Sequence, residues 1–92
     1  MYYVYILFSL KDYQLYIGFT PDLKSRIKAH LGGFVKATKY RRPLKLIYYE
    51  AYYEISDAKR REKYLKGGNG RGELKIQLKT ILEKRNYKNR LH

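Results

Sequence analysis

The sequence predicts one α/β domain, in which a three-stranded antiparallel sheet is flanked by three helices in the order ββαβαα. Two observations predict this fold class. Three segments are rich in β-branched and aromatic residues, and three others repeat apolar residues at helical spacing between capping and glycine signals. The chain has 92 residues, which suffice for one modest core. We expect the domain to cover residues 1–85, followed by a basic C-terminal tail over residues 86–92.

The strands are predicted from composition. Residues 2–8 and 14–19 consist largely of tyrosine, isoleucine, leucine and phenylalanine, and the turn-forming residues 9–12 between them favour a hairpin. A third strand is predicted over residues 44–53, where Pro43 opens it.

Side-chain alternation suggests a register for the hairpin. Pairing Val4 with Ile17 puts the apolar side chains of both strands on one face. The same pairing places Tyr5 directly opposite Tyr16 on the other face.

The helices are predicted from caps and periodicity. The first begins with an N-cap at Thr20 and ends at Leu31, the second runs from a cap at Ser56 to about Lys66, and the third covers residues 73–85. The glycine-rich segment 67–70 is expected to break the chain between the last two.

The charge indicates a polyanionic partner. The chain has 21 lysines and arginines against 8 acidic residues, a net charge of +13, and residues 24–46 contain eight basic residues and no acidic ones. Solubility alone does not require such an excess, so we expect nucleic acid to be the partner. A membrane partner is not expected, because the most basic stretch, residues 59–66, offers only Tyr64 and Leu65 as bulky apolar groups.

Other functional classes are excluded by what the sequence lacks. There is no cysteine, which removes disulfides, thiolate catalysis and cysteine-based zinc sites. There is no run of eighteen apolar residues, and the N-terminus lacks the features of a signal peptide. We therefore expect a cytoplasmic protein.

One acidic residue calls for an explanation. Ala58, Glu62 and Leu65 recur at spacings of four and three, so Glu62 lies on the inward side of the second predicted helix. A surface salt bridge to Lys66 is one interpretation of Glu62, and a functional carboxylate is the other.

The arrangement of these residues resembles the GIY-YIG nuclease family. The two signature strands correspond to Tyr3-Val4-Tyr5 and Tyr16-Ile17-Gly18, and they are followed by Arg26, His30 and Glu62. Tyr16 follows Tyr5 by eleven positions, Arg26 follows Tyr16 by ten, and His30 follows Arg26 by four. The resemblance spans roughly residues 2 to 80 and is closest to the small stand-alone bacterial members of the UPF0213 type. Tyr3 departs from the pattern, because it stands where the name-giving glycine is found.

The resemblance implies a metal-dependent endonuclease that hydrolyses DNA phosphodiester bonds. It assigns Glu62 as the sole protein ligand of one Mg²⁺ or Mn²⁺ ion, with no small-molecule cofactor. Tyr5 becomes the candidate general base, with Tyr16 beside it to favour the phenolate. Arg26 would present its planar guanidinium to the scissile phosphate, and His30 would bind a phosphate or relay a proton, unless it is a structural histidine.

Further residues are candidates for nucleic-acid binding. Gly18 would allow a close approach beside the two tyrosines. The loop after the first helix offers a set of phosphate contacts: Lys36, Thr38, Lys39, Arg41 and Arg42. The alternative to an enzyme is a catalytically inactive basic module that binds nucleic acid. DNA is favoured over RNA, and we expect a monomer or a weak homodimer. The substrate structure and the pathway, DNA repair among others, are left open.

Overall fold

The fold is built on a three-stranded antiparallel sheet, as the sequence predicts. The structure is a computed structural model that describes residues 1–85, so the predicted tail over residues 86–92 lies outside the described residues. The strands are β1 (Tyr2–Ser9), β2 (Leu15–Thr20) and β3 (Leu44–Tyr52), and their order across the sheet is β2-β1-β3. The first strand is therefore central and pairs with both others.

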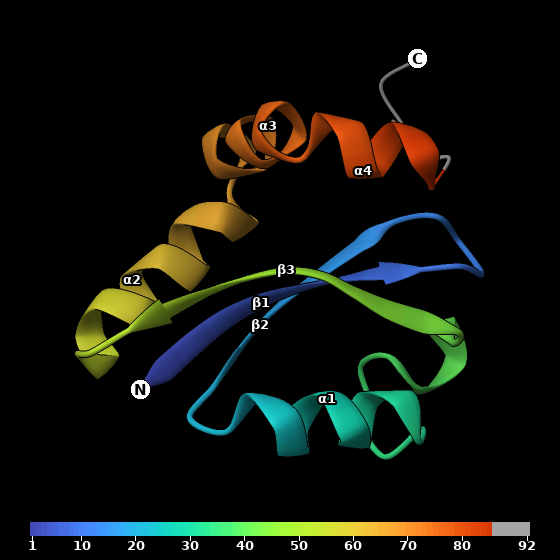
Figure 1. The fold of residues 1–92 in the computed structure, drawn as a ribbon, viewed down its shortest axis with the longest axis horizontal. Helices are drawn as coiled ribbons and strands as arrows, with labels where there is room; N and C mark the ends of the chain where they lie inside the picture. The colour runs from blue at the N-terminus through green and yellow to red at the C-terminus, as the bar shows by residue number, and fades with distance from the viewer. Residues whose placement is uncertain (86–92) are drawn as a thin grey trace.

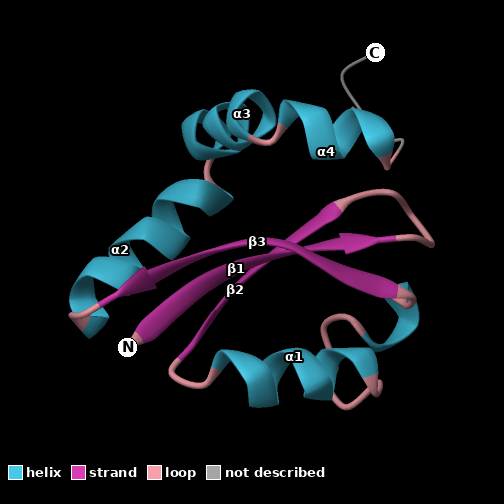
Figure 2. Ribbon diagram, viewed as in Figure 1, coloured by secondary structure: helices cyan, strands magenta, loops and turns pink. Residues whose placement is uncertain are grey.

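The helices cover both faces of the sheet (Figures 1 and 2). One face carries α1 (Leu23–Leu31), and the other carries α2 (Ile55–Lys66), α3 (Gly68–Gln77) and α4 (Lys79–Lys84). A short 3-10 helix, η1 (Lys39–Arg41), lies between α1 and β3. Within residues 1–85, no helix combines the length and the hydropathy needed to span a membrane.

Alternate residues of β1 belong to two separate cores. Val4, Ile6 and Phe8 pack with the buried side chains of α2, α3 and α4. Tyr5 and Leu7 point the other way, toward the apolar side of α1. Because side chains alternate across a strand, one short segment supplies both interiors.

The hairpin register differs from the predicted one by two residues. Val4 pairs with Phe19 instead of Ile17, so Tyr5 lies opposite Gly18 and diagonal to Tyr16. A slip of two residues keeps every side chain on its predicted face.

The turn explains the slip in register. The Ser9 hydroxyl accepts hydrogen bonds from the backbone N–H groups of Lys11 and Asp12, at 3.1 and 3.2 Å. Asp12 in turn accepts one from the N–H of Gln14 at 3.0 Å, and Tyr13 takes a left-handed conformation with φ of 57°. These side-chain contacts move the centre of the turn toward β2.

Three predicted helix boundaries are also wrong. The side chain that caps α1 is Asp22, which accepts from the N–H of Ser25, instead of Thr20. The second helix begins at Ile55, before the predicted cap Ser56. The predicted last helix is two helices, separated at Leu78.

The glycine-rich segment continues as helix instead of breaking the chain. Only Gly67 is extended, and α3 begins at the next residue. Gly70 is buried where α3 crosses α2: a Cβ there would lie 2.0 Å from the carbonyl oxygen of Tyr64. This glycine allows two helices to approach closely, a use that local sequence does not reveal.

Candidate active site

The site is built around Tyr5, at the centre of β1 on the side facing α1. Its side chain is only 1% exposed, and its ring lies directly against Gly18 of the neighbouring strand. A Cβ at position 18 would lie 2.3 Å from Cζ of Tyr5. Gly18 therefore provides a close approach for the Tyr5 ring, whereas its predicted contact with nucleic acid stays a prediction.

A buried chain of hydrogen bonds starts at the Tyr5 hydroxyl. The phenol oxygen lies 2.7 Å from Nε2 of His30, and Nδ1 of His30 lies 2.7 Å from the hydroxyl oxygen of Thr38. His30 and Thr38 are both fully buried. When the phenol donates to Nε2, the imidazole proton is on Nδ1 and is donated to Thr38, which fixes the tautomer.

The histidine in this chain is uncharged at neutral pH. Burial, and secondarily the positive charge of Arg26, lowers the pKa of His30 to about 4. A neutral imidazole keeps a lone pair on one nitrogen. His30 is thus able to accept the hydrogen bond that the phenol donates.

Burial raises the pKa of Tyr5 above its ordinary value of 10.0. Arg26 opposes this effect, because its guanidinium acts on the phenol oxygen as a hydrogen-bond donor and as a charge. Tyr16 and Glu62 each raise the pKa further. The phenol therefore keeps its proton at neutral pH in this structure.

Tyr16 lies beside this chain. Its ring centroid is 6.3 Å from that of Tyr5 and 5.2 Å from the centroid of the His30 ring. The two tyrosines are diagonal neighbours on one face of the sheet. The sequence predicted this shared face correctly, although it placed the two residues directly opposite each other.

Glu62 of α2 acts on the same phenol through its charge, which raises the pKa of Tyr5. Its neighbours at spacings of four and three, Ala58 and Leu65, are fully buried, and the Glu62 side chain is 23% exposed. Its carboxylate contacts the ammonium group of Lys66 at 2.9 Å. The predicted salt bridge from Glu62 to Lys66 is confirmed, and the functional role of this carboxylate stays a prediction.

The donor set fits a divalent cation that is held largely by its substrate. Among residues 1–85, there is no cluster of three or more histidine, aspartate and glutamate side chains that could hold a metal ion. Mg²⁺ is commonly bound by one or two carboxylates, with water and phosphate oxygens completing the shell. The partly exposed Glu62 carboxylate suits a site of that kind.

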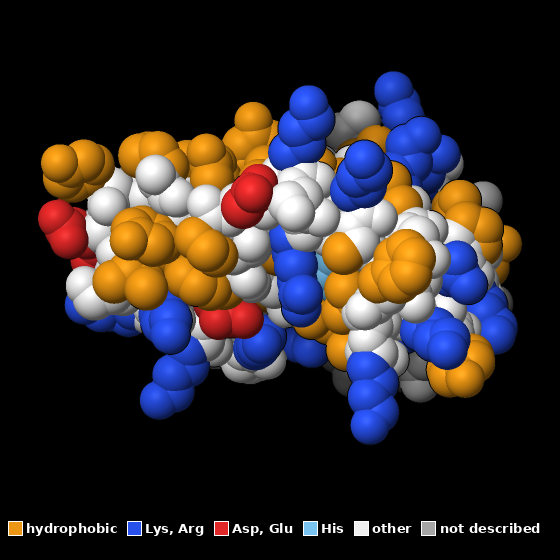
Figure 3. All heavy atoms as spheres, turned by 90° about the horizontal axis from the view of Figure 1, so that it is seen from below, with side chains coloured by type: hydrophobic (Ala, Val, Ile, Leu, Met, Phe, Trp, Pro, Cys, Tyr) orange, Lys and Arg blue, Asp and Glu red, His pale blue; other side chains and the backbone are white. Residues whose placement is uncertain are grey.

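The basic loop divides into surface and internal residues. Lys36, Lys39 and Arg42 are exposed, and seen from the α1 side, basic and hydrophobic side chains are interspersed over the surface (Figure 3). Arg41 is half-buried and pairs with Asp12 at 2.7 Å. Thr38 is fully buried, so its hydroxyl serves His30 and is not presented to a phosphate at the surface.

A second polar cluster was not predicted from the sequence. Glu50 of β3 accepts hydrogen bonds from the hydroxyls of Tyr48 and Tyr52 and from the guanidinium of Arg61. Alternation could have revealed it, because Tyr48, Glu50 and Tyr52 occupy every second position of β3 and so share the face covered by α2.

Comparisons with known proteins agree with the motifs. A family model described as the GIY-YIG catalytic domain matches residues 1–75. A UPF0213 protein of Clostridium perfringens is 38% identical over 93 residues, which cover 100% of this chain and 99% of that protein. A UPF0213 protein of Staphylococcus haemolyticus is 41% identical over 75 residues, which cover 80% of this chain and 90% of the relative. No solved structure gives a significant match.

Proposed function

The chain belongs to the GIY-YIG family, and from this premise we propose that it is an endonuclease that hydrolyses phosphodiester bonds, in DNA above all. One observation carries the proposal. The Tyr5 hydroxyl meets His30 at 2.7 Å, and both Arg26 and Glu62 act electrostatically on the same hydroxyl. Three residues of the family pattern, far apart in the sequence, thus act on the hydroxyl of a fourth, one by a direct contact and two through the pKa of Tyr5.

The convergence suggests how a protonated tyrosine can act as a base. As Tyr5 takes a proton from the attacking water, its own proton passes to Nε2 of His30. The resulting hydroxide attacks phosphorus, and the bond to the departing 3′-oxygen breaks with its electron pair on that oxygen, which takes a proton from solvent. His30 offers a lone pair for this proton because its low pKa keeps it neutral, and Thr38 holds its other nitrogen in the required tautomer. As a weak base, His30 then returns the proton to Tyr5, which releases one to solvent.

Arg26 and Glu62 act on the phosphate. The guanidinium of Arg26 is exposed and can offer two parallel N–H donors to phosphate oxygens as charge accumulates in the transition state. A divalent cation at Glu62, Mg²⁺ or Mn²⁺, would act as a Lewis acid on the same phosphate.

Exposed cations of the loop would hold the backbone of the substrate. Lys36, Lys39 and Arg42 follow α1 directly and can contact phosphates without reading bases. Residues 1–85 form one such site, so cleavage of both strands of a duplex would require two copies or two successive events.

The substitution Glu62→Gln tests the proposal, since it preserves size and removes the charge that a hard cation requires. Nicking of plasmid, branched and linear DNA with Mg²⁺ or Mn²⁺ should disappear. DNA binding in metal-free buffer should persist or tighten slightly, because net positive charge rises by one. Stability should change by less than about 1 kcal/mol, as for exposed ion pairs.

Glu83→Gln is the matched control, because it removes one exposed carboxylate from α4 and produces the same change in net charge. It should nick DNA like the unmodified protein. The alternative, a catalytically inactive binding module, predicts that neither variant nor the unmodified chain nicks DNA. Metal-dependent nicking by a pure, folded Glu62→Gln protein would contradict the assigned role of Glu62.

A further inference from the structure

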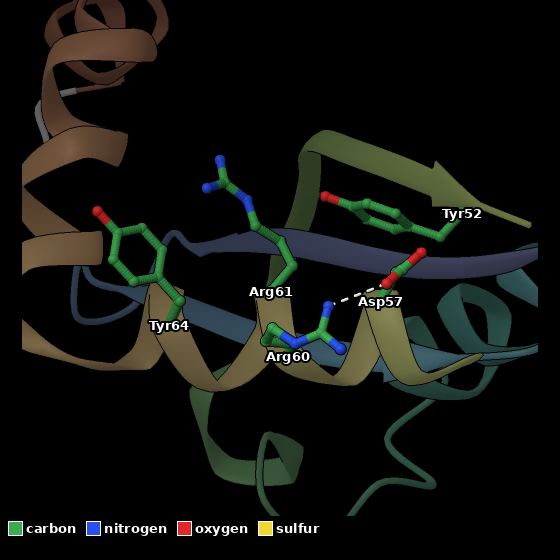
Figure 4. Close-up of a pocket in the computed structure, with 5 residues that line it drawn as sticks. All are labelled: Tyr52, Asp57, Arg60, Arg61 and Tyr64. Carbon is green, nitrogen blue, oxygen red and sulfur yellow. Dashed lines mark hydrogen bonds and ion pairs between the residues drawn. The ribbon is translucent and has the colours of Figure 1, made fainter. Parts of the chain in front are cut away.

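A pocket between β3 and α2 lies outside the proposed active site. Its volume is about 430 Å³, and its lining residues are Tyr52, Asp57, Arg60, Arg61 and Tyr64 (Figure 4). Arg61 contacts Glu50 of β3, whereas the next residue, Glu62, acts on Tyr5. Two neighbouring residues of α2 thus serve two different sites.

The charged groups at the back of this pocket are already paired. Arg61 donates to both carboxylate oxygens of Glu50, at 2.9 and 3.1 Å, and contacts Glu73 at 3.5 Å. The Tyr52 hydroxyl donates to the same Glu50 carboxylate. The positive charge of Arg61 is therefore offset by two carboxylates, and the pocket is poorly suited to a bare anion.

The sides of the pocket suit a flat aromatic ring. In Figure 4 the rings of Tyr52 and Tyr64 lie on either side of the Arg61 side chain. The Arg61 guanidinium lies over the Tyr64 ring, 5.6 Å from its centroid, and Tyr64 is still 44% exposed. Tyrosine rings and guanidinium planes are the groups on which nucleic-acid bases stack.

The rim of the pocket offers hydrogen-bonding groups of both kinds. Arg60 and Asp57 pair there at 2.9 Å, and their side chains are 73% and 53% exposed. A guanidinium can donate to a ring nitrogen or carbonyl of a base, and a carboxylate can accept from an exocyclic amine. These groups could bind the edge of a base that stacks on Tyr64.

Basic residues connect this pocket with the proposed active site. Lys59 and Lys63 lie on the exposed side of α2. Arg61 lies on one edge of this exposed side, and Glu62 lies on the other. The ammonium group of Lys59 lies over the ring of Phe19 in β2, next to Gly18. A sugar-phosphate backbone could therefore cross α2 from the proposed cleavage point to the pocket.

We propose that the pocket binds an unpaired nucleobase of the substrate strand, adjacent to the position that is cleaved. A paired base within a continuous duplex cannot enter, because its faces are covered by neighbouring base pairs. The substrate class is thus DNA with a single-stranded segment, such as a flap, a gap or a branch. The inference rests on the nucleic-acid substrate of the proposed function, and it adds the requirement for an unpaired base.

Binding of oligonucleotides tests this inference independently of cleavage. Fluorescence anisotropy with the Glu62→Gln protein in metal-free buffer would compare a labelled single strand with a blunt duplex of equal length. Tyr64→Ala should weaken binding of the single strand about tenfold, the usual contribution of one stacked base, and leave the duplex unaffected. Tyr64→Phe keeps the ring and should bind the single strand nearly as well as the parent protein.

Tyr49→Ala is the matched control, because Tyr49 is 50% exposed and its ring contacts Tyr3, on the other face of the sheet. It should change neither affinity. Photocrosslinking with a single strand that carries 5-iodouracil should label the peptide containing Tyr52 or Tyr64. The proposal that the pocket binds a base would be overturned by any of three results. Tyr64→Ala and Tyr49→Ala could lose equal affinity, Tyr64→Ala could lose equal affinity for the single strand and the duplex, or Tyr64→Ala could lose no affinity. Absence of metal-dependent nicking by the unmodified protein would instead overturn the nuclease, while ring-dependent binding of single strands would still support the pocket.

Discussion

At the residue scale, the proposed proton transfer from Tyr5 requires a neighbour with a free lone pair, and His30 is the residue that offers one. Its side chain is fully buried between the Tyr5 hydroxyl and the Thr38 hydroxyl, each 2.7 Å away. Arg26 adds a positive charge nearby, which also disfavours protonation of the imidazole. The same surroundings that keep His30 neutral must also make the stability of the protein depend on pH.

The pKa of His30, lowered from 6.5 to about 4 by burial, gives the sign of this dependence. Between these values the unfolded chain binds a proton that the folded chain excludes, so stability falls as pH decreases from 6.5 toward 4. The full effect is on the order of 3 kcal/mol. Denaturant titrations between pH 5 and 7.5 should show a rising free energy of unfolding.

The variant His30→Gln provides the comparison for that measurement, because glutamine does not titrate and can still form hydrogen bonds. It should lose most of the slope above pH 5. Asp12 and Glu50 contribute elsewhere, because their pKa values are lowered from 3.8 and 4.5 by paired arginines and their contributions are lost only at lower pH. A slope of equal size in the variant would show that another group is responsible.

Arg26→Lys separates charge from geometry. Lysine preserves the positive charge but lacks the planar fork of arginine, so nicking should fall by about a hundredfold while the melting temperature stays nearly constant. Lys28→Arg, the reverse exchange at an exposed position of the same helix, should leave activity unchanged. Full activity of a folded Arg26→Lys protein would remove Arg26 from the catalytic set.

At this scale the sequence was informative where a motif exists. The spacing of Tyr5, Tyr16, Arg26 and His30 was sufficient to select them, and the structure gathers them around one hydroxyl. The burial of Thr38 could not be predicted, because its position in a basic loop indicates a surface contact. Only the tertiary fold of that loop brings the Thr38 hydroxyl to His30.

At the scale of elements, the contact between α2 and α3 depends on one glycine. Gly70→Ala would place a methyl group 2.0 Å from the Tyr64 carbonyl oxygen and 2.6 Å from Cα of Leu65, so the helices would have to separate. We expect a loss of about 1–3 kcal/mol in the free energy of unfolding, as is usual for overpacking.

Gly72→Ala is the control for this prediction, because it lies in the same helix and a Cβ there has no neighbour within 4 Å. Alanine has the higher helix propensity, so this variant should be more stable by about 0.5–1 kcal/mol. Chemical denaturation of both variants measures the difference. The same sign of effect for both would show that helix propensity, and not the close contact, governs Gly70.

Element boundaries show where local sequence is insufficient. The existence of all three strands was predicted correctly, because β-branched and aromatic runs are a strong signal. The hairpin register was wrong because Ser9 and Asp12 define the turn through their side chains. The prediction for the glycine-rich segment was wrong because Gly70 serves a tertiary contact, in which α3 approaches α2 closely, and local sequence does not show such a contact.

At the scale of the whole molecule, the excess positive charge should govern affinity for nucleic acid. The logarithm of the binding constant should fall linearly with the logarithm of salt concentration. Lys36→Ala should make the slope shallower by about one, because an exposed lysine releases one counterion per phosphate contact.

Arg41→Ala should behave differently, because its guanidinium pairs with Asp12 and donates to the carbonyl of Leu15. The slope should stay nearly the same, and the melting temperature should fall, since the loop loses its connection to the β1–β2 turn. Binding isotherms at several salt concentrations, with thermal melts of the same preparations, distinguish the two residues. An equal change of slope for both would place Arg41 among the phosphate contacts.

The central position of β1 determines how the protein should lose its function when it is heated. Tyr5 lies between Val4 and Ile6, which belong to the opposite core, and it is bonded to strands on both sides. No hinge or surface loop carries the phenol, so it cannot loosen while the rest of the sheet remains intact. Loss of function on heating should therefore be a single cooperative event. No temperature range should exist in which a molecule that is still folded but has a disordered active site accumulates.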